Sequence, residues 1–175
     1  CGYTMTMPSL CPACGLPGLE IVGYGTERIE DEVESVFPDE KISRMDLDTT
    51  RNKNSYERII DDFSSHKTNI LVGTQMVTKG LDFDGVSIVG ILNADALISF
   101  PDFRASERAF NMMEQVAGRA GRAHKQGTVL VQTTRPTHPI VEFVKNHNYQ
   151  EFFNYELSER QQYNFPPFTR IVNVY

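Results

Sequence analysis

The sequence predicts an α/β fold in which a parallel sheet carries helices on both faces. Three stretches are apolar without polar alternation, as expected of strands buried on both sides: Ile70–Val72, Val86–Leu92 and Thr128–Gln132. Before and between them lie segments with apolar residues at i, i+3, i+4 and i+7, the period of an amphipathic helix. Strands that alternate with such helices are typical of α/β domains, whose ligands bind beyond the carboxyl ends of the strands.

Length and composition fit a globular protein. The chain has 175 residues, 40% of them hydrophobic and 10% aromatic, enough for one domain with a buried core. Because it begins at Cys1 and ends in an aromatic run, we expect a fragment of a longer protein. No apolar run approaches the roughly 18 residues of a membrane span, and three cysteines favour the cytosol over a disulfide framework. We therefore expect a cytoplasmic protein with no membrane partner.

The net charge of −6 gives no general support for nucleic-acid binding, but the charges are unevenly spread. Seven acidic residues and one basic residue lie between Glu27 and Glu40, whereas six Lys or Arg and three acidic residues lie between Pro101 and Arg135. A locally basic site on an acidic protein can attract an anionic ligand, although the same pattern also arises by chance.

Residues 1–18 form a separate element. Two residues separate Cys11 from Cys14, and Gly15 permits a tight turn around a metal. Cys1 adds a third thiol, but a closed structural zinc site needs four ligands. Either a fourth ligand lies upstream or these are ordinary thiols. A redox role is weaker, because the C-x-x-C motif does not sit where a strand meets a helix.

The first half of the chain predicts strands separated by helices. Thr26 is a candidate N-cap, and Pro38 ends the helix that follows it. In order, we expect a strand at Leu19–Val22, a helix that buries Ile29, Val33, Val36 and Phe37, a strand at Ile42–Met45, the polar loop Asp46–Asn52, and a helix that buries Tyr56, Ile59, Ile60 and Phe63.

The second half predicts further helices. One has a single buried stripe and is ended by Gly118 and Gly121; the stripe consists of Ala109, Met113, Val116 and Ala117. Two polar helices are expected at Pro139–Lys145 and Tyr149–Leu157, and the first strand of another domain at Ile171–Tyr175. Four histidines in loops or at helix ends are expected to be surface residues: His66, His124, His138 and His147.

Arg119 and Arg122 lie where the helix with this buried stripe ends in a turn of small residues. A guanidinium binds phosphate oxygens through two parallel hydrogen bonds and keeps its charge, so it suits the charge that develops during phosphoryl transfer. The alternative is a pair of solvated arginines that the helix dipole favours.

Several stretches, in this order, resemble motifs V and VI of superfamily 2 helicases. They are Gly73-Thr74 with Gly80-x-Asp82-Phe83, then Asn93-Ala94-Asp95, and then Gln115-x-x-Gly118-Arg119-x-Gly121-Arg122. Other stretches are similar in sequence to the primosomal replication-restart helicases (the primosomal protein N′ family). These are Gly73-Thr74-Gln75-Met76, Pro101-Asp102-Phe103-Arg104 with Glu107-Arg108, and the loop from Ser43 to Thr50. The resemblance covers essentially the whole chain.

The resemblance implies a RecA-like lobe of the P-loop NTPase type and assigns roles to individual residues. Nucleic-acid phosphates would contact Thr49, Thr50, Thr74 and Gln75. Gly80 and Asp82 would bind the nucleotide, with Asp82 at the ribose. Gln115 would position water or a phosphate oxygen, and Arg119 and Arg122 would be arginine fingers. The cysteines would be zinc ligands in a two-metal element, Cys1 in one site and Cys11 with Cys14 in the other, both incomplete here.

The chain contains no G-x-x-x-x-G-K-[ST] phosphate loop, which in the family belongs to an upstream lobe. The resemblance therefore implies ATP with Mg²⁺ shared with a missing lobe, and a chain that alone does not hydrolyse ATP. Its domains would be a partial zinc-binding element (1–18), the second RecA-like lobe (19–157) and the start of a truncated domain (158–175).

The expected function is that of the second motor lobe of an ATP-dependent 3′-to-5′ DNA helicase. It would act on single-stranded and forked DNA in replication restart and primosome assembly, with primosome and single-strand-binding proteins as partners. Two alternatives stay open: a zinc-bearing adaptor that does not hydrolyse ATP, and an RNA helicase lobe of the same superfamily. The adaptor is disfavoured by four intact motif residues: Gly80, Gln115, Arg119 and Arg122. The cysteine motif with Pro101–Arg104 argues against the RNA helicase.

Overall fold

The computed structural model describes residues 8–17, 25–77, 83, 85–121 and 127–172. They belong to two compact units, Cys1–Thr74 and Gln75–Tyr175. The predicted strand Leu19–Val22 lies outside the described residues, as do Gly80, Asp82, Arg122, Cys1 and His124. Within the part of the chain that is described, no helix is both long enough and apolar enough to cross a membrane.

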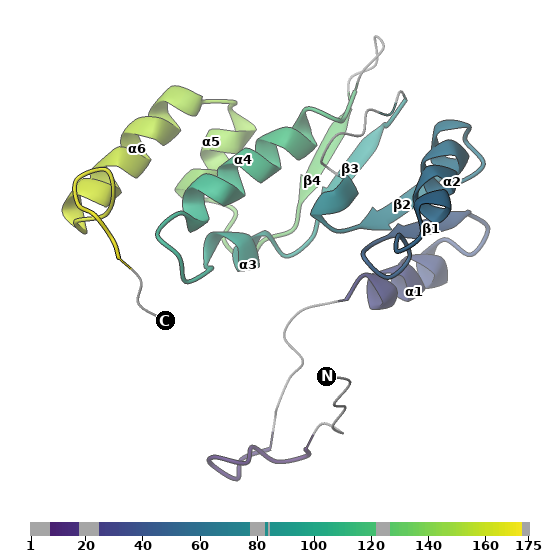
Figure 1. Cartoon of the computed structure of the whole chain (residues 1–175), viewed down its shortest axis with the longest axis horizontal. Coiled ribbons are helices and arrows are strands. Elements are labelled where there is room, and N and C mark those ends of the chain that lie inside the picture. Colours follow the sequence, from purple (N-terminus) through teal and green to yellow (C-terminus); the bar gives the residue numbers. More distant parts are fainter. Residues whose placement is uncertain (1–7, 18–24, 78–82, 84, 122–126, 173–175) are drawn as a thin grey trace. The chain divides into compact units, whose positions relative to one another are not determined.

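In the first unit two parallel strands are flanked by two helices (Figure 1). Met45 lies opposite Gly73 in the strand register, so both strands end at the same edge, where the segments beginning at Asp46 and Thr74 start. The predicted strands Ile42–Met45 and Ile70–Val72 are confirmed, the second with one added residue. The elements are α1 (Thr26–Val36), β1 (Ile42–Met45), α2 (Lys53–Ser64) and β2 (Ile70–Gly73).

Two predictions about α1 are wrong. Gly25 is the N-cap residue, and Thr26 begins the helix with its hydroxyl donating to Oδ2 of Asp46 at 2.5 Å. The apolar face is not buried either, since Val36 is 68% and Phe37 49% exposed. The reason is size: a helix of 11 residues is about 16 Å long, whereas the two described strands of this unit, spaced about 4.8 Å apart, cover only part of it.

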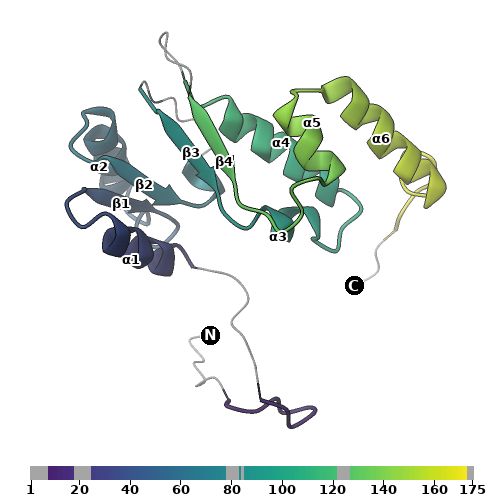
Figure 2. The ribbon, with the colours of Figure 1, turned by 180° about the vertical axis from the view of Figure 1, so that it is seen from behind.

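The second unit contains another parallel pair of strands with helices packed on one face. In Figure 2 the strands β3 and β4 are seen with no helix of their own unit in front of them. On that face Ile88 is 63% and Leu130 57% exposed. The described residues of this unit place no helix there, so helices on both faces stay a prediction. The elements are η1 (Gln75–Val77), β3 (Ile88–Ile91), α3 (Ala94–Ile98), α4 (Ala105–Ala117), β4 (Thr128–Val131), α5 (Pro139–Lys145) and α6 (Tyr149–Gln162).

The core of the second unit lies between its strands and α4, α5 and α6. Phe110 of α4 stacks on Phe152 of α6 with ring centroids 4.0 Å apart. The last two helices are therefore not merely polar. The predicted end of the last helix at Leu157 is wrong, because α6 continues to Gln162. Of the predicted strand 171–175, the structure describes only Ile171 and Val172, which belong to no strand.

Helices α2, α5 and α6 end in the same way. The residue after each C-cap has left-handed backbone geometry: His66 (φ 55°), His147 (φ 50°) and Asn164 (φ 55°). Their N–H groups and those of the next residues donate back to the last turn, which is the Schellman motif. This confirms that His66 and His147 lie at helix ends; His138 is the N-cap residue of α5.

Candidate functional site

The end of α4 carries the first group of predicted site residues. Ala109, Met113 and Val116 are buried, so the predicted stripe is confirmed except for half-buried Ala117. Gly118 is the C-cap residue. Gln115 is exposed in the last turn, and half-buried Arg119 follows the cap, its N–H donating to Val116 O at 3.0 Å. An amide and a guanidinium both supply N–H donors of the kind that phosphate oxygens accept.

Backbone contacts fix the turn that follows Arg119. Gly121 has a φ of 80°, and its N–H donates to Val86 O at 3.1 Å. A Cβ on Gly127 would lie 2.2 Å from the Gly121 nitrogen and 2.6 Å from the Ala120 Cβ. Only glycine fits there. Sequence reasoning missed Gly127, although a glycine directly before a strand signals a close backbone approach.

The end of α4 lies at the amino edge of the β3–β4 pair. Val86 and Ser87 precede β3, and Thr128 donates to Ser87 O at 2.9 Å. The stretch Asn93–Asp95 follows β3 and therefore lies at the opposite, carboxyl edge. The rule that ligands bind at carboxyl ends of strands does not extend to Arg119.

Asp95 ties the carboxyl edge of this pair together. Its carboxylate accepts from the Thr134 N–H (2.7 Å), the Thr133 hydroxyl (2.8 Å) and Arg135 Nε (3.4 Å). The Thr134 N–H is the main reason that the pKa of Asp95 falls to about 2. The side chain is thus engaged within the protein rather than presented to a ligand.

In the first unit Asp46 organises the loop Asp46–Asn52. The residue is 9% exposed, and its carboxylate accepts from the Thr26 hydroxyl and from the N–H groups of Asp48 (3.0 Å) and Thr49 (2.9 Å). These hydrogen bonds lower the pKa of Asp46 to about 2; the Thr26 hydroxyl has the largest effect and the Thr49 N–H the next largest. The carboxylate is charged at neutral pH and holds the loop closed.

The two threonines of this loop turn their hydroxyls inward. Thr49 Oγ1 accepts from Asp46 N–H at 3.0 Å, and Thr50 Oγ1 donates to Asp46 O. Arg51 faces outward with its side chain 80% exposed, and it pairs with equally open Asp48 at 2.9 Å. Exposed pairs of this kind contribute about 0–1 kcal/mol, so a phosphate can take the place of Asp48. Thr74 and Gln75 are exposed, one in each unit.

The described part of the cysteine element is a small turn. Leu10 and Pro17 form an antiparallel bridge, and Gly15 (φ 70°) donates to Cys11 O at 2.8 Å. The Cys14 N–H is the main cause that lowers the pKa of the free Cys11 thiol. Cys11 and Cys14 could supply two thiolates, but the described residues contain no group of three potential metal ligands. A zinc site stays a prediction.

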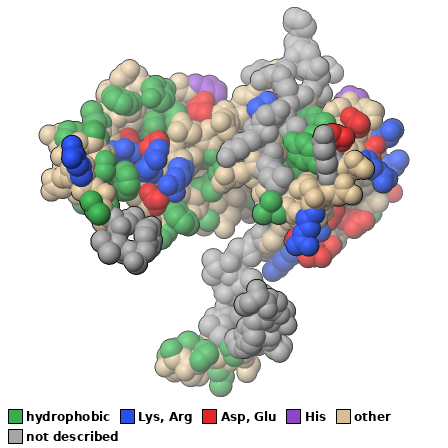
Figure 3. Space-filling view, viewed as in Figure 1, with side chains coloured by type: hydrophobic (Ala, Val, Ile, Leu, Met, Phe, Trp, Pro, Cys, Tyr) green, Lys and Arg blue, Asp and Glu red, His purple; other side chains and the backbone are tan. Residues whose placement is uncertain are grey.

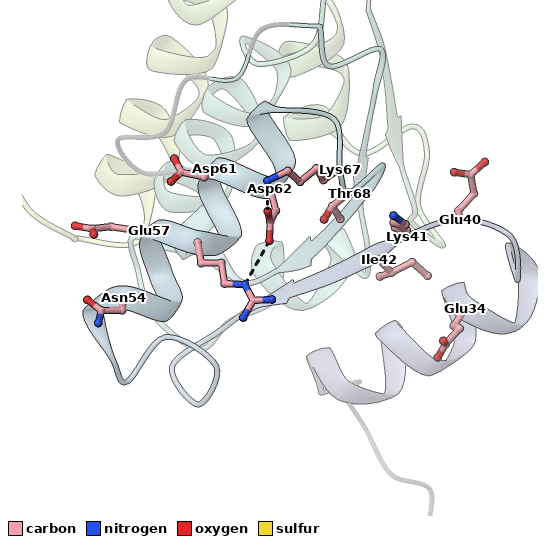
Figure 4. A pocket seen from close by; sticks show the side chains of 11 residues that line it. Glu34, Glu40, Lys41, Ile42, Asn54, Glu57, Asp61, Asp62, Lys67 and Thr68 are labelled. Atoms are coloured by element: carbon pink, nitrogen blue, oxygen red, sulfur yellow. Dashed lines mark hydrogen bonds and ion pairs between the residues drawn. The ribbon is translucent and has the colours of Figure 1, made fainter.

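A wide hollow of about 1000 Å³ lies beside α2 in the first unit (Figure 4). Asp62 stands within it and pairs with Lys67 (3.3 Å) and Arg58 (3.6 Å). Its acidic residues outnumber its basic ones: Glu34, Glu40, Glu57, Asp61 and Asp62 against Lys41, Arg58 and Lys67. This balance repels phosphate, so the hollow is not the predicted nucleic-acid site.

The stretch Pro101–Arg108 forms an ion-pair network at the start of α4. Figure 3 shows Lys and Arg side chains, with acidic ones among them, over α4 and α6. Glu107 accepts from Arg104 (2.9 Å) and from Arg160 of α6 (2.7 Å). The Arg104 hydrogen bond is the main cause that lowers the pKa of Glu107 to about 2. Arg160 also binds Glu156 at 2.9 Å and lies over the Phe103 ring at 5.4 Å.

Comparison with known proteins places these residues in a family. Residues 21–124 match the model of the helicase conserved C-terminal domain. The chain is 41% identical over 96% of its length to the replication restart protein PriA of Bacillus subtilis (strain 168), and 41% identical over 98% to that of Synechocystis. It is 33% identical over 99% of its length to PriA of Borreliella burgdorferi. It spans 21% of the first two relatives and 26% of the third. With its motif residues at the end of α4 and after β1 and β2, the chain belongs to the family of helicase conserved C-terminal domains.

Proposed function

We propose that this chain is the second motor lobe of an ATP-dependent 3′-to-5′ DNA helicase of the replication-restart type. The observation that carries the proposal is Arg119 beside Gln115 at a helix end fixed by Gly121 and Gly127, in a chain similar to PriA over nearly its whole length. Single-stranded and forked DNA would be the substrates, and primosome and single-strand-binding proteins the partners.

In this proposal each group at the end of α4 has one task. ATP with Mg²⁺ supplies the γ-phosphoryl group that is transferred to water. Gln115 orients water or a phosphate oxygen through its amide, and Arg119 places a permanent charge where negative charge develops. Arg122 would be a second finger, and Gly80 and Asp82 would contact the nucleotide. The hydrogen bond from Gly121 to Val86 joins the turn after Arg119 to the segment before β3.

The 175 residues by themselves are expected to show no DNA-stimulated ATP hydrolysis. They contain no G-x-x-x-x-G-K-[ST] loop to hold the β- and γ-phosphates. The measurement is phosphate release by the purified chain and by a longer protein that adds such a lobe. Turnover by the chain alone that Arg119→Ala abolishes would contradict the division of the site between two lobes. No turnover by the longer protein would instead favour an adaptor.

DNA contact in the first unit is assigned to Arg51 together with the loop that Asp46 holds closed. Thr49 and Thr50, whose hydroxyls bond to Asp46, would support this loop, and Thr74 would approach phosphates from the same strand edge. Arg51 directly precedes Asn52, the N-cap residue of α2, whose first turn contains no acidic residue. Positive charge there is unfavourable for the helix alone and favourable for binding an anion.

Arg51→Ala is expected to weaken binding of single-stranded DNA and to reduce the slope of log affinity against log salt by about 0.7, the value for one phosphate contact. The measurement is fluorescence anisotropy with a labelled oligonucleotide over a series of KCl concentrations. Arg58→Ala is the matched control, because Arg58 is equally exposed but pairs with Asp62 in the acidic hollow. Equal slopes for the two variants would remove Arg51 from the DNA path.

A further inference from the structure

The last turn of α4 borders an apolar hollow of about 390 Å³. Met113 and Ala117 line it from the helix, Val129 from β4 and Val144 from α5. Protein interiors are normally close-packed, and side chains beside an empty space lose dispersion contacts there. The side chains that line this hollow therefore have fewer packing partners on that side than they would have in a filled core.

A polar contact between described residues joins the same turn to the segment after α5. Oε2 of Glu114 lies 3.0 Å from Nδ1 of His147, in the turn between α5 and α6. The other carboxylate oxygen, Oε1, is buried and has no hydrogen-bond partner among the described residues. Burying an unpaired carboxylate oxygen is energetically unfavourable. The Glu114 carboxylate therefore depends on His147 for its position.

His147 occupies a backbone position that normally favours glycine. Its φ is 50°, and it is the residue after the C-cap in the Schellman motif that ends α5, with Asn148 N–H donating to Phe143 O. For a non-glycine residue this geometry is unfavourable, because Cβ lies too close to the following carbonyl oxygen. A residue that opposes local preference points to a role of its side chain, and the side chain of His147 reaches Glu114.

We propose that Glu114 and His147 are positioning residues whose contact holds the end of α4 in place for ATP hydrolysis. The Glu114 carbonyl accepts from Gly118 N–H at 2.9 Å, so a shift of Glu114 is passed to the C-cap and to Arg119 directly after it. Gln115 is adjacent in the chain and moves with it. The catalytic part of this inference rests on the proposed function; the mechanical part rests on the contact itself.

The mechanical part is tested by hydrogen exchange in the 175-residue chain with His147→Asn. Asparagine tolerates the left-handed backbone, as Asn164 does at the end of α6, but it lacks the imidazole. The amides of Gly118, Arg119 and Gly121 are expected to exchange about tenfold faster, a coupling of ordinary size for residues in contact. His66→Asn, at the equivalent position after α2, is the matched control and leaves these amides unchanged.

A second variant separates local loosening from general destabilisation. Val144→Ile adds one methylene to the hollow, and in the His147→Asn background it is expected to return the exchange of these amides toward the parent rate. Unchanged exchange in His147→Asn would overturn the proposal, and so would an increase of equal size throughout the second unit.

The catalytic part is tested in a longer protein that also carries a phosphate-binding lobe. Both His147→Asn and Glu114→Ala are expected to lower kcat about tenfold with little change in KM for ATP, because a misplaced finger weakens the transition state and not ground-state binding. The double variant is expected to lose no more than either single variant. Faster local exchange with normal kcat would overturn the catalytic part. Absent ATPase activity in the unmodified longer protein would refute the proposed function instead.

Discussion

Arg119→Lys in a two-lobed protein is expected to lower kcat for ATP hydrolysis by about 10³ to 10⁵, the range measured for arginine fingers. Lysine keeps the charge but lacks the planar fork that binds two phosphate oxygens at once. Arg122→Lys is expected to act in the same way. DNA affinity is expected to change little, because the finger acts on charge that develops at the γ-phosphoryl group.

The matched control for this prediction is Arg108→Lys. Arg108 lies on the same helix, is exposed and pairs with Asp102 at 2.9 Å, far along the helix from Gly118. The measurements are ATPase rate, DNA affinity and melting temperature for each variant. Arg119 follows the helix end and is only half-buried, so its loss is expected to cost about 1 kcal/mol at most. Activity lost only in proportion to folding would show that Arg119 has no catalytic role.

Arg160→Met is expected to lower the free energy of unfolding of the second unit by about 2–4 kcal/mol, as for other largely buried ion pairs that lose one partner. The change leaves Glu156, which is 9% exposed, without its guanidinium and removes one of the two arginines on Glu107. It also removes the cation–π contact with Phe103. Urea unfolding followed by circular dichroism measures the loss.

Arg28→Met is the control, because its pair with Glu32 is exposed on both sides and is expected to contribute about 0–1 kcal/mol.

The contribution of Glu107 to stability has a defined pH dependence. Its pKa in the folded chain is lowered to about 2, so its stabilisation is complete above the ordinary glutamate pKa of about 4.3 and is lost as the pH falls toward 2. The difference in the free energy of unfolding between the parent and Arg160→Met should therefore shrink as the pH falls below about 4.3. A difference that does not depend on pH would mean that packing, not charge, accounts for the loss.

Local patterns in the sequence located most elements of the fold. The strand Ile42–Met45 and the helix Pro139–Lys145 begin and end at the predicted residues, and α4 ends at Gly118 with Arg119 directly beyond it. Apolar period, proline at a first helical position and glycine at a helix end all act within a few neighbouring residues. Such signals need no knowledge of the rest of the molecule.

Errors arose where distant residues decide the outcome. The predicted end of the last helix at Leu157 overlooked Arg160, whose partner Glu107 lies 53 residues away. The buried face assigned to α1 assumed a sheet broad enough to cover it, whereas the described strands of that unit form one pair. Periodicity reports which face of a helix is apolar; it does not report how much surface lies opposite.

The sequence by itself determined the α/β class, the order of the motifs and the helix end that presents Gln115 and Arg119. Only the tertiary structure decided where side chains point and which distant groups meet. Thr49 and Thr50 turn toward Asp46, leaving Arg51 outward, and His147 reaches Glu114 across 33 residues of chain. Position 127 requires glycine because the backbone at Gly121 lies too close to leave room for a Cβ there. The physical reason is common to all of these. Helix and strand periods follow from the backbone of consecutive residues, whereas a hydrogen-bond partner or a close approach exists only once the chain has folded back on itself.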